Sequence, residues 1–329
     1  MKKLMVIVAA LAMVTGSAYA ADWNFYGSAR IQTFITDMEE ANTDNFDETL
    51  QGNSRIGATV KVSDELTGGF EYGTGVNMRK LYGEWNFGSG SFLVGQTYTP
   101  LNMFYSNQVY GEDTGLLNTG GVYSGRHGML RLKFGGFQIA AVDPSTPAGA
   151  DVGIPAIEAK YSLSLGAVSF ALAGGYQSYE VVGLGDVDSY VIALGAGMNL
   201  GGVTLGANVY TGQNAGDLIA VNTDTEGGWN TNGSADTSGA TILDNDNLGF
   251  LIVAGYKVND MFGIEAGYSW ASTEVDGDVD DDTVAGYYLQ AKITLAPGVF
   301  FVPEIGQYDY DEAGQGELTY YGVKWQINF

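Results

Sequence analysis

The chain of 329 residues contains no cysteine, a single histidine and only 14 lysines and arginines. The lack of cysteine excludes disulfide bonds and metal sites built from thiolates. Because 38 acidic residues accompany so few basic ones, the net charge is −24 and binding to nucleic acid is not expected. A hydrolase that needs a histidine as base or metal ligand would have to use the single histidine, His127.

Long apolar runs are also missing once residues 1–20 are set aside. These residues combine two lysines, an apolar stretch over 4–14 and the sequence Ala-Tyr-Ala at 18–20, which is typical of a secretory signal peptide. We therefore predict cleavage after Ala20 and one mature domain over residues 21–329. No later stretch reaches the about 18 apolar residues of a transmembrane helix, so a membrane-spanning form of this chain would be a β-barrel.

Alternation of apolar and polar residues recurs along the rest of the chain. The apolar residues of the closing stretch YGVKWQINF are Tyr321, Val323, Trp325, Ile327 and Phe329. A period of two is typical of β-strands that have one apolar and one polar face. Sixteen such segments begin near residues 23, 51, 67, 79, 91, 126, 137, 155, 167, 188, 202, 247, 261, 283, 298 and 317. No segment has the period of an amphipathic helix, so the sequence predicts an all-β fold.

The connections between these segments alternate in length. Short turns such as Gly135-Gly136 join half of the neighbouring segments, and on the other side only the connection near Gly75 is short. The long connections span residues 37–50, 97–125, 143–154, 179–187, 212–246, 272–282 and 309–316. This long-loop side, edges included, carries 29 of the 38 acidic residues and almost no lysine or arginine. The pattern predicts a transmembrane, antiparallel, up-and-down barrel of about 16 strands, apolar outside and polar inside.

Four stretches resemble the general porins of bacterial outer membranes: WNFYGSARIQTF at 23–34, GEWNFGSGSFLVGQTYTP at 83–100, VPEIGQYDYDEA at 302–313 and the closing YGVKWQINF. The resemblance covers the whole mature chain. It implies a 16-stranded, usually trimeric, water-filled pore in the outer membrane of a Gram-negative cell. It also implies that the third long loop, residues 97–125, folds inward, and that the closing strand ending in Phe329 is the signal recognised by the barrel-assembly machinery.

Two features depart from the family pattern. The sequence Gly95-Gln96 stands where the family often has Gly-Arg, so one charge of the constriction is absent. The second loop, near Gly75 to Met78, is very short, whereas in the family it can latch a neighbouring subunit. This shortening removes one support for the expected homotrimer. The other expected partners are outer-membrane lipid and lipopolysaccharide, the assembly machinery and small hydrophilic solutes.

Charged residues on the polar strand faces and in the third loop are candidates for the pore constriction. Those that resemble the family's basic wall cluster and the acidic loop residues opposite it are Arg30, Arg55, Lys80, Arg131, Glu112 and Asp113. Opposite charges across a narrow aqueous gap create a field that orders water and hinders solutes without compensating dipoles. Alternatively, each residue is polar only because it faces water. Arg79 has the wrong parity for the lumen, but a slip of one residue would exchange it with Lys80.

Two other features are candidates for chemistry. The acidic stretch 276–282 offers Asp276, Asp278 and Asp280 as weak Ca²⁺ ligands, because Ca²⁺ prefers carboxylate oxygens. Its spacing does not match an EF-hand, and a solvated acidic loop is the favoured interpretation. His127 could serve a hydrolase, but no carboxylate is near it in sequence, and a pore-wall histidine is favoured. No cofactor is expected.

The sequence therefore predicts a passive diffusion porin, not an enzyme, that passes small hydrophilic solutes and ions down their gradients. The alternatives are a barrel lipase or protease and a structural or adhesive barrel with a plugged lumen. Wall bases favour anions, whereas the acidic loops favour cations at the mouth. Since the loop acids far outnumber the loop bases, we expect weak cation selectivity that fades as salt screens the loops.

Overall fold

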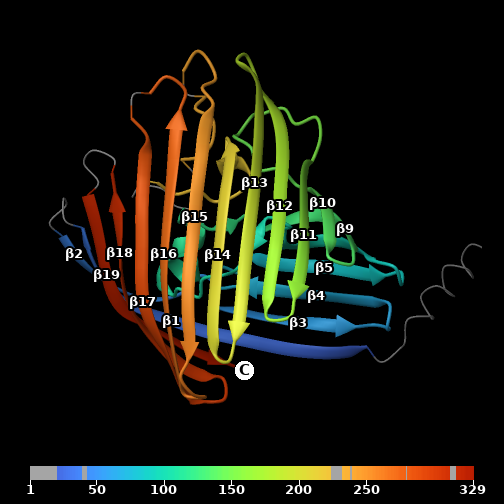
Figure 1. Ribbon diagram of the computed structural model, residues 1–329. Coiled ribbons are helices and arrows are strands. Elements are labelled where there is room, and N and C mark those ends of the chain that lie inside the picture. The colour runs from blue at the N-terminus through green and yellow to red at the C-terminus, as the bar shows by residue number, and fades with distance from the viewer. Residues whose placement is uncertain (1–20, 39–42, 224–231, 238, 279, 312–315) are drawn as a thin grey trace, which may run out of the picture.

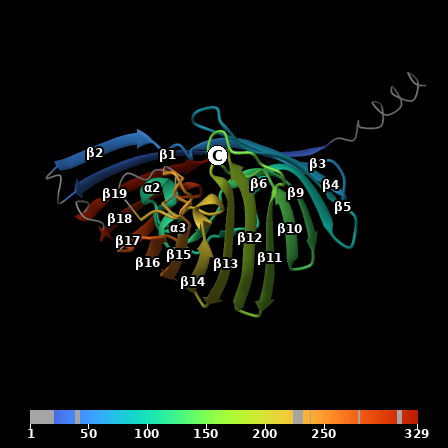
Figure 2. The ribbon, with the colours of Figure 1, turned by 90° about the horizontal axis from the view of Figure 1, so that it is seen from above.

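The computed structural model describes residues 21–38, 43–223, 232–237, 239–278, 280–311 and 316–329. The expected signal peptide, residues 1–20, lies outside the described residues. Within them the chain forms one large antiparallel sheet, which closes on itself where β1 (Asp22–Met38) pairs with β19 (Gly316–Asn328). The sheet curves around an interior that holds two short helices (Figures 1 and 2).

The strands follow one another around the barrel in chain order. Between β1 and β19 lie β2 (Thr43–Leu50), β3 (Arg55–Lys61), β4 (Leu66–Gly73), β5 (Met78–Asn86), β6 (Ser91–Tyr98), β9 (Arg126–Phe134), β10 (Phe137–Val142), β11 (Ala156–Leu165), β12 (Val168–Val181), β13 (Gly185–Leu200), β14 (Val203–Gln213), β15 (Asn245–Lys257), β16 (Phe262–Val275), β17 (Asp282–Ala296) and β18 (Val299–Tyr310). β2 pairs with the C-terminal half of β1 and β3 with its N-terminal half, so together they count as one barrel strand. The described residues thus form sixteen barrel strands, which confirms the predicted fold.

The first long connection differs from its prediction. The sequence predicts a loop over residues 37–50, but most of it is strand, and the break falls instead at 51–54. Residues 45–50 are all exposed. Where both faces of a strand meet water, the apolar alternation disappears, so this part of the strand carries no sequence signal. Gln51, by contrast, is fully buried, because the break turns into the barrel.

The two faces of the sheet are sorted as the alternation predicts. Outward-facing side chains that are 44–56 % exposed include Leu172, Leu194, Leu205, Ile252 and Leu289. Inward-facing side chains that are at most 4 % exposed include Gln177, Ser189, Asn208, Asn247 and Ser269. Apolar groups outside and polar groups inside reverse the order of a water-soluble barrel and suit a barrel in lipid.

The third loop, between β6 and β9, folds into the barrel as predicted. It contains β7 (Asn102–Met103), α2 (Tyr110–Asp113), α3 (Gly115–Thr119) and β8 (Val122–Tyr123). Its apolar residues Leu101, Met103, Leu116 and Val122 are at most 3 % exposed, and α3 lies against β15, β16 and β17. Figure 2 shows both helices inside the ring of strands. In the part of the chain that is described, no helix is long and apolar enough to cross a membrane.

A second segment, residues 214–223 between β14 and β15, also enters the barrel, which the sequence analysis does not predict. It contains the 3₁₀ turn η1 (Ala215–Asp217). The backbone N–H of Ala220 donates to the Tyr123 carbonyl over 2.9 Å, and that of Asn222 to the Asn118 carbonyl over 2.9 Å. The segment is therefore fastened to the third loop itself. The apolar run Leu-Ile-Ala-Val at 218–221 is the one sequence signal that marks it.

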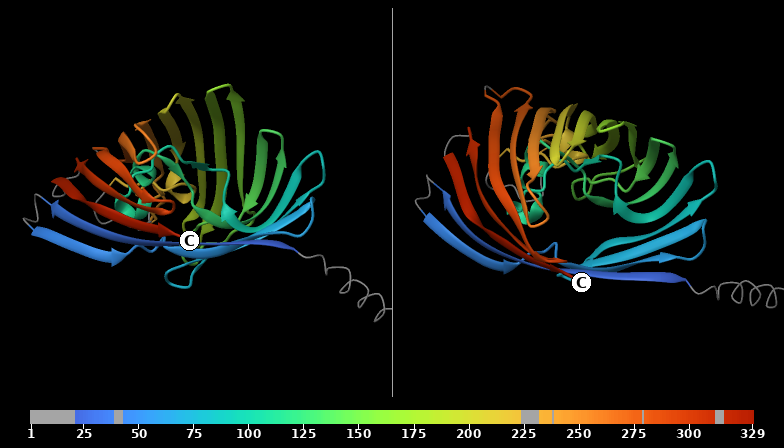
Figure 3. Two further views of the ribbon diagram at one scale, coloured as in Figure 1. Left: turned by 90° about the horizontal axis from the view of Figure 1, so that it is seen from below. Right: turned by 60° about the horizontal axis from the view of Figure 1, so that its bottom comes forward.

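The closing strand places the alternating apolar residues of YGVKWQINF on the outer face. Tyr321, Trp325, Ile327 and Phe329 are 47–73 % exposed, and Val323 is half-buried. Phe329 exchanges two backbone hydrogen bonds with Gly27 on β1, of 2.6 and 3.0 Å. Figure 3 shows the C-terminus beside the blue β1. Its ring covers Gly27 so closely that a Cβ there would lie 2.4 Å from it. The role of these five residues in assembly stays a prediction.

Candidate pore constriction

Among the described residues, a cavity lies on each side of the third loop. A cavity of about 1050 Å³ reaches the long-loop side at Gly75 and Ser145. A cavity of about 580 Å³ reaches the short-turn side at Gly202 and residues 259–261. Asn107 and Lys324 line both cavities. A solute that crosses the barrel would therefore meet its narrow section beside the third loop. The ionisable residues lining the larger cavity are Arg30, Arg55, Arg79, Glu112, Asp113, Arg126, His127, Asp217 and Lys324.

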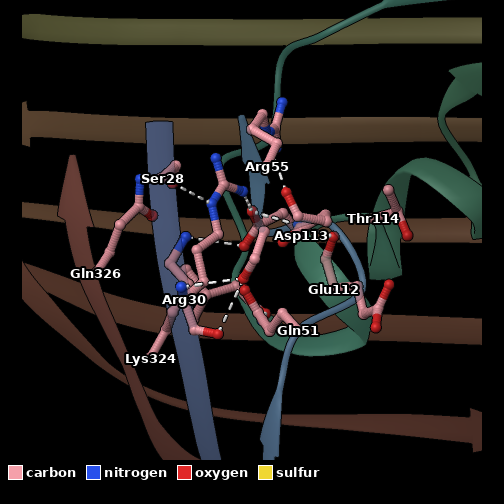
Figure 4. A network of polar contacts seen from close by, with 12 residues as sticks. Ser28, Arg30, Gln51, Arg55, Glu112, Asp113, Thr114, Lys324 and Gln326 are labelled. Atoms are coloured by element: carbon pink, nitrogen blue, oxygen red, sulfur yellow. Dashed lines mark hydrogen bonds and ion pairs between the residues drawn. The ribbon is translucent and has the colours of Figure 1, made fainter. Parts of the chain in front are cut away.

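Asp113 fastens the tip of the third loop to the barrel wall. Its carboxylate forms an ion pair with Arg30 on β1 and accepts a 2.8 Å hydrogen bond from Nζ of Lys324 on β19 (Figure 4). Asn53 Nδ2 donates to the same carboxylate over 2.8 Å. The sequence analysis expects charges that face one another across water, whereas here the acid of the loop and the bases of the wall are in direct contact.

The backbone at this tip is strained. Gly111, Glu112 and Asp113 have φ angles of 62°, 57° and 69°, a left-handed conformation that costs about 1–3 kcal/mol for a residue other than glycine. The break in the wall at 51–54 supplies partners that hold this conformation. The N–H of Gly52 donates to Glu112 Oε1 over 2.7 Å, and Asn53 Nδ2 to the Glu112 carbonyl over 2.6 Å. The interrupted strand and the strained loop tip thus form one structural unit.

Wall glutamates fix the loop at three further points. Glu158 Oε2 accepts a 3.0 Å hydrogen bond from the N–H of Leu101, and Glu265 Oε1 a 2.8 Å bond from that of Asn107. Glu304 accepts two more, including a 2.7 Å bond from the N–H of Val109. These bonds are spread over residues 101–110 of the loop, so its position is set by several contacts and not by Asp113 alone.

Buried side chains are found both in the third loop and in the segment 214–223 beside it. Tyr110 stacks on Tyr320, with ring centres 3.8 Å apart. Burial, with help from nearby carboxylates, raises the pKa of the Tyr110 hydroxyl to about 12, so it is neutral at physiological pH. In the segment 214–223, burial raises the pKa of the Asp217 carboxyl, while the hydrogen bond from Ser189 acts in the opposite direction.

Glu71 on β4 lies at the centre of a second charged group. Its carboxylate contacts Arg79 Nε at 2.8 Å, Lys80 Nζ at 3.5 Å and Arg55 Nη1 at 3.6 Å. Strand β5 carries an extra residue here, because Glu71 pairs with Lys80 and Tyr72 with Met78. This β-bulge turns both Arg79 and Lys80 to the lumen. The question of parity between these two residues is thereby answered: both face inward.

We expect Glu71→Gln to shift the zero-current potential of the channel toward anions. One carboxylate offsets three cations at this point, and its removal leaves all three uncompensated. Because breaking a buried ion pair costs about 3–5 kcal/mol, the heat resistance of the barrel should also fall. Asp64→Asn is the matched control, since Asp64 forms an exposed pair with Lys61 in a short turn. A shift in Glu71→Gln no larger than in this control would contradict the expectation.

Four of the six predicted constriction residues line the larger cavity: Arg30, Arg55, Glu112 and Asp113. The other two contact Tyr98, which also lines it. Lys80 Nζ lies 5.5 Å from the Tyr98 ring centre, and Arg131 Nη1 donates to the Tyr98 carbonyl over 3.1 Å.

Residues that the sequence analysis does not place at the site are Lys324, Glu71 and Arg126. Lys324 could have been found as a base on the polar face of the closing strand, two positions before the partner of Arg30 in register. Glu71 is an acid on a strand face that otherwise carries little charge, but only its neighbours on β3 and β5 give it a role.

The acidic stretch 276–282 and His127 were considered above as candidates for metal binding or catalysis. Among the described residues, no group of three or more histidines and carboxylates is placed to hold a metal ion. Asp276, Asp278 and Asp280 stand in the hairpin between β16 and β17, where weak Ca²⁺ binding stays a prediction. His127 lines the larger cavity, and its Nε2 lies 2.9 Å from the Ser124 carbonyl.

Comparison with known proteins assigns the family. A family model described as Gram-negative porin matches residues 8–313. The chain belongs to the Gram-negative porin family. Accordingly, this porin is an outer-membrane barrel of the channel-forming kind. A search of the curated proteins finds no match.

Solved structures share the porin's fold at low sequence identity. The outer membrane channel DcaP of Acinetobacter baumannii has a TM-score of 0.78 and 16 % identity, covering 95 % of this chain and 99 % of that one. The anion-selective porin from Comamonas acidovorans has a TM-score of 0.69 and 15 % identity, covering 94 % and 100 %. The trimer form of OmpT from Vibrio cholerae has a TM-score of 0.64 and 17 % identity, covering 94 % and 100 %.

Proposed function

We propose that this porin is a passive diffusion channel for small hydrophilic solutes and ions, which works without a cofactor or an energy source. The observation that carries the proposal is the pair of cavities, each lined in part by polar side chains, on either side of the third loop, with Asn107 and Lys324 common to both. A loop that is fixed to the wall at many points narrows such a path to a constant size. Molecules smaller than the gap would then pass by diffusion alone.

The test is single-channel recording in a planar lipid bilayer. The proposal predicts discrete steps of conductance in KCl. A structural or adhesive barrel with a plugged lumen would give no steps. If the protein were instead a barrel hydrolase, His127→Ala would abolish the hydrolytic activity and leave the conductance intact, which would overturn the purely channel-forming role.

We expect weak cation selectivity that fades as salt rises. The acidic loops attract cations to the mouth, and Asp113 and Glu71 offset part of the basic charge inside. At 0.15 M salt the Debye length is about 8 Å, so the loop charges act only on ions that pass close to them. The measurement is the zero-current potential across a KCl gradient, repeated at high salt. A clear anion preference, as the name of the Comamonas relative states for that porin, would mean that the wall bases dominate.

A homotrimer in the outer membrane is the proposed assembly. The OmpT of Vibrio cholerae has been solved in a trimer form. The outer face of this barrel is apolar, as a contact face between subunits in lipid would be. The proposed surroundings are lipid and lipopolysaccharide, reached after cleavage of a signal peptide at Ala20 and insertion by the barrel-assembly machinery. Migration as a trimer in unheated detergent gels, and an N-terminal sequence that starts at Ala21, are the expected results.

A further inference from the structure

Phe104 is a large apolar side chain that is exposed inside the lumen. It is 53 % exposed and lines the larger cavity. Its loop neighbours Met103 and Tyr105 turn the other way, toward the wall, where they fill the space that side chains at Gly195 and Gly206 would take. The loop therefore directs two of three consecutive side chains into packing and leaves the ring of Phe104 facing the path of solutes.

Two neighbouring rings hold Phe104 in one orientation. Its ring centre lies 4.9 Å from that of Tyr98 at an interplanar angle of 73°, and 6.0 Å from that of Tyr123 at 69°. Both are edge-to-face contacts, the geometry that aromatic pairs prefer. The exposed surface of the Phe104 ring is thus presented to the cavity by a rigid aromatic group.

Arg126 places a positive charge beside this aromatic group. Its Cζ lies 5.0 Å from the Tyr98 ring centre, and its Nη1 donates to the Tyr98 hydroxyl over 2.8 Å. Arg30, Arg55 and Arg79, which line the same cavity, are each paired with a carboxylate. Within the described ranges, Arg126 has no carboxylate within ion-pair distance. It is therefore a base that faces the lumen without a fixed counter-charge.

We propose that Phe104, Tyr98 and Arg126 form a subsite for aromatic carboxylates in the path through the barrel. The proposal deepens the proposed function, since it names a class of solute for the same channel. The carboxylate pairs with the Arg126 guanidinium, which suits the planar shape of that group. The ring of the solute packs on the exposed surface of Phe104. Lys80, 5.5 Å from the Tyr98 ring centre, adds positive potential to the same side of the site.

The subsite predicts an order of binding among three carboxylates of equal charge. Benzoate uses both parts of the site, cyclohexanecarboxylate uses the charge and some apolar contact, and acetate uses the charge alone. In single-channel recordings, benzoate should interrupt the current at a concentration about fivefold lower than cyclohexanecarboxylate does, and acetate should be the weakest. Equal effects of benzoate and acetate on the natural porin would overturn the proposal.

Two substitutions of Phe104 distinguish the contribution of its aromatic ring from that of its apolar character. Phe104→Tyr keeps the ring and should keep the preference for benzoate. Phe104→Leu keeps an apolar side chain and should make benzoate and cyclohexanecarboxylate equivalent. Arg126→Gln should weaken all three carboxylates together. If Phe104→Leu retains the benzoate preference, the ring of the solute is recognised by groups other than Phe104, and the proposal is wrong.

A binding measurement distinguishes failure of the subsite from failure of the channel. Isothermal titration of the detergent-solubilised porin with benzoate reports the subsite directly, whether or not the barrel conducts. Binding that disappears in Arg126→Gln without any conductance would support the subsite and reject the diffusion channel. Conductance without any benzoate binding would do the reverse.

Discussion

Shortening the third loop between Asn107 and Gly120 is expected to raise the single-channel conductance by a factor of at least roughly two, since a 16-stranded barrel leaves an aqueous channel where its lumen is not filled. The deletion removes α2, α3 and the strained turn that Asp113 fastens to Arg30 and Lys324. Glu304 loses its loop partners Val109 and Tyr110, but its carboxylate would then face water, which solvates it well. The barrel should therefore still assemble.

The increase should be limited by the segment 214–223, which stays in the lumen through its own contacts with the wall. Asp217 accepts a 2.6 Å hydrogen bond from Ser189, and Thr223 lies 3.1 Å from Thr273, hydroxyl to hydroxyl. Removing Ala148 and Gly149 from the connection between β10 and β11 is a control that leaves the lumen unchanged. Heat resistance on gels verifies assembly of each variant. Unchanged conductance in a loop variant that assembles would mean that another section limits the current.

Deleting Phe329 should leave the porin exported but poorly assembled in the outer membrane. The lost contacts in the folded barrel are modest: two backbone hydrogen bonds to Gly27, each worth about 0.5–1.5 kcal/mol, and a ring that faces outward. A loss of nearly all heat-resistant barrel at the surface would be larger than the loss of these two hydrogen bonds explains. It would therefore indicate that the aromatic end is recognised during assembly.

The controls separate recognition from lost stability. Phe329→Trp keeps an aromatic end and should retain most of the assembled barrel. Phe262→Ala removes another outward-facing phenylalanine, 44 % exposed and near a short turn, and should assemble almost normally. Surface levels of the deletion variant that match those of the unaltered porin would refute the assembly role of Phe329.

Most of the barrel wall could be predicted from the sequence alone, the exception being β2. Lipid outside and water inside impose alternation on every spanning strand, so local periodicity was enough to place the strand that begins at residue 22 as well as the one that ends at residue 328. The inward third loop followed from the family resemblance, and with it Glu112 and Asp113 as candidates. The bases Arg30 and Arg55 followed from parity together with that resemblance.

How these parts meet depends on contacts between strands and loops that are separate in the sequence. The bulge that turns Arg79 inward depends on the pairing of β4 with β5, and no periodicity within one strand can show it. The contact of Asp113 with Lys324 joins residues that lie 211 positions apart in the chain. The segment 214–223 lies inside because the third loop offers it apolar surface and backbone partners. Such contacts depend on barrel closure, which brings residues of distant strands to the same level of the lumen. The local sequence pattern does not predict which residues share a level.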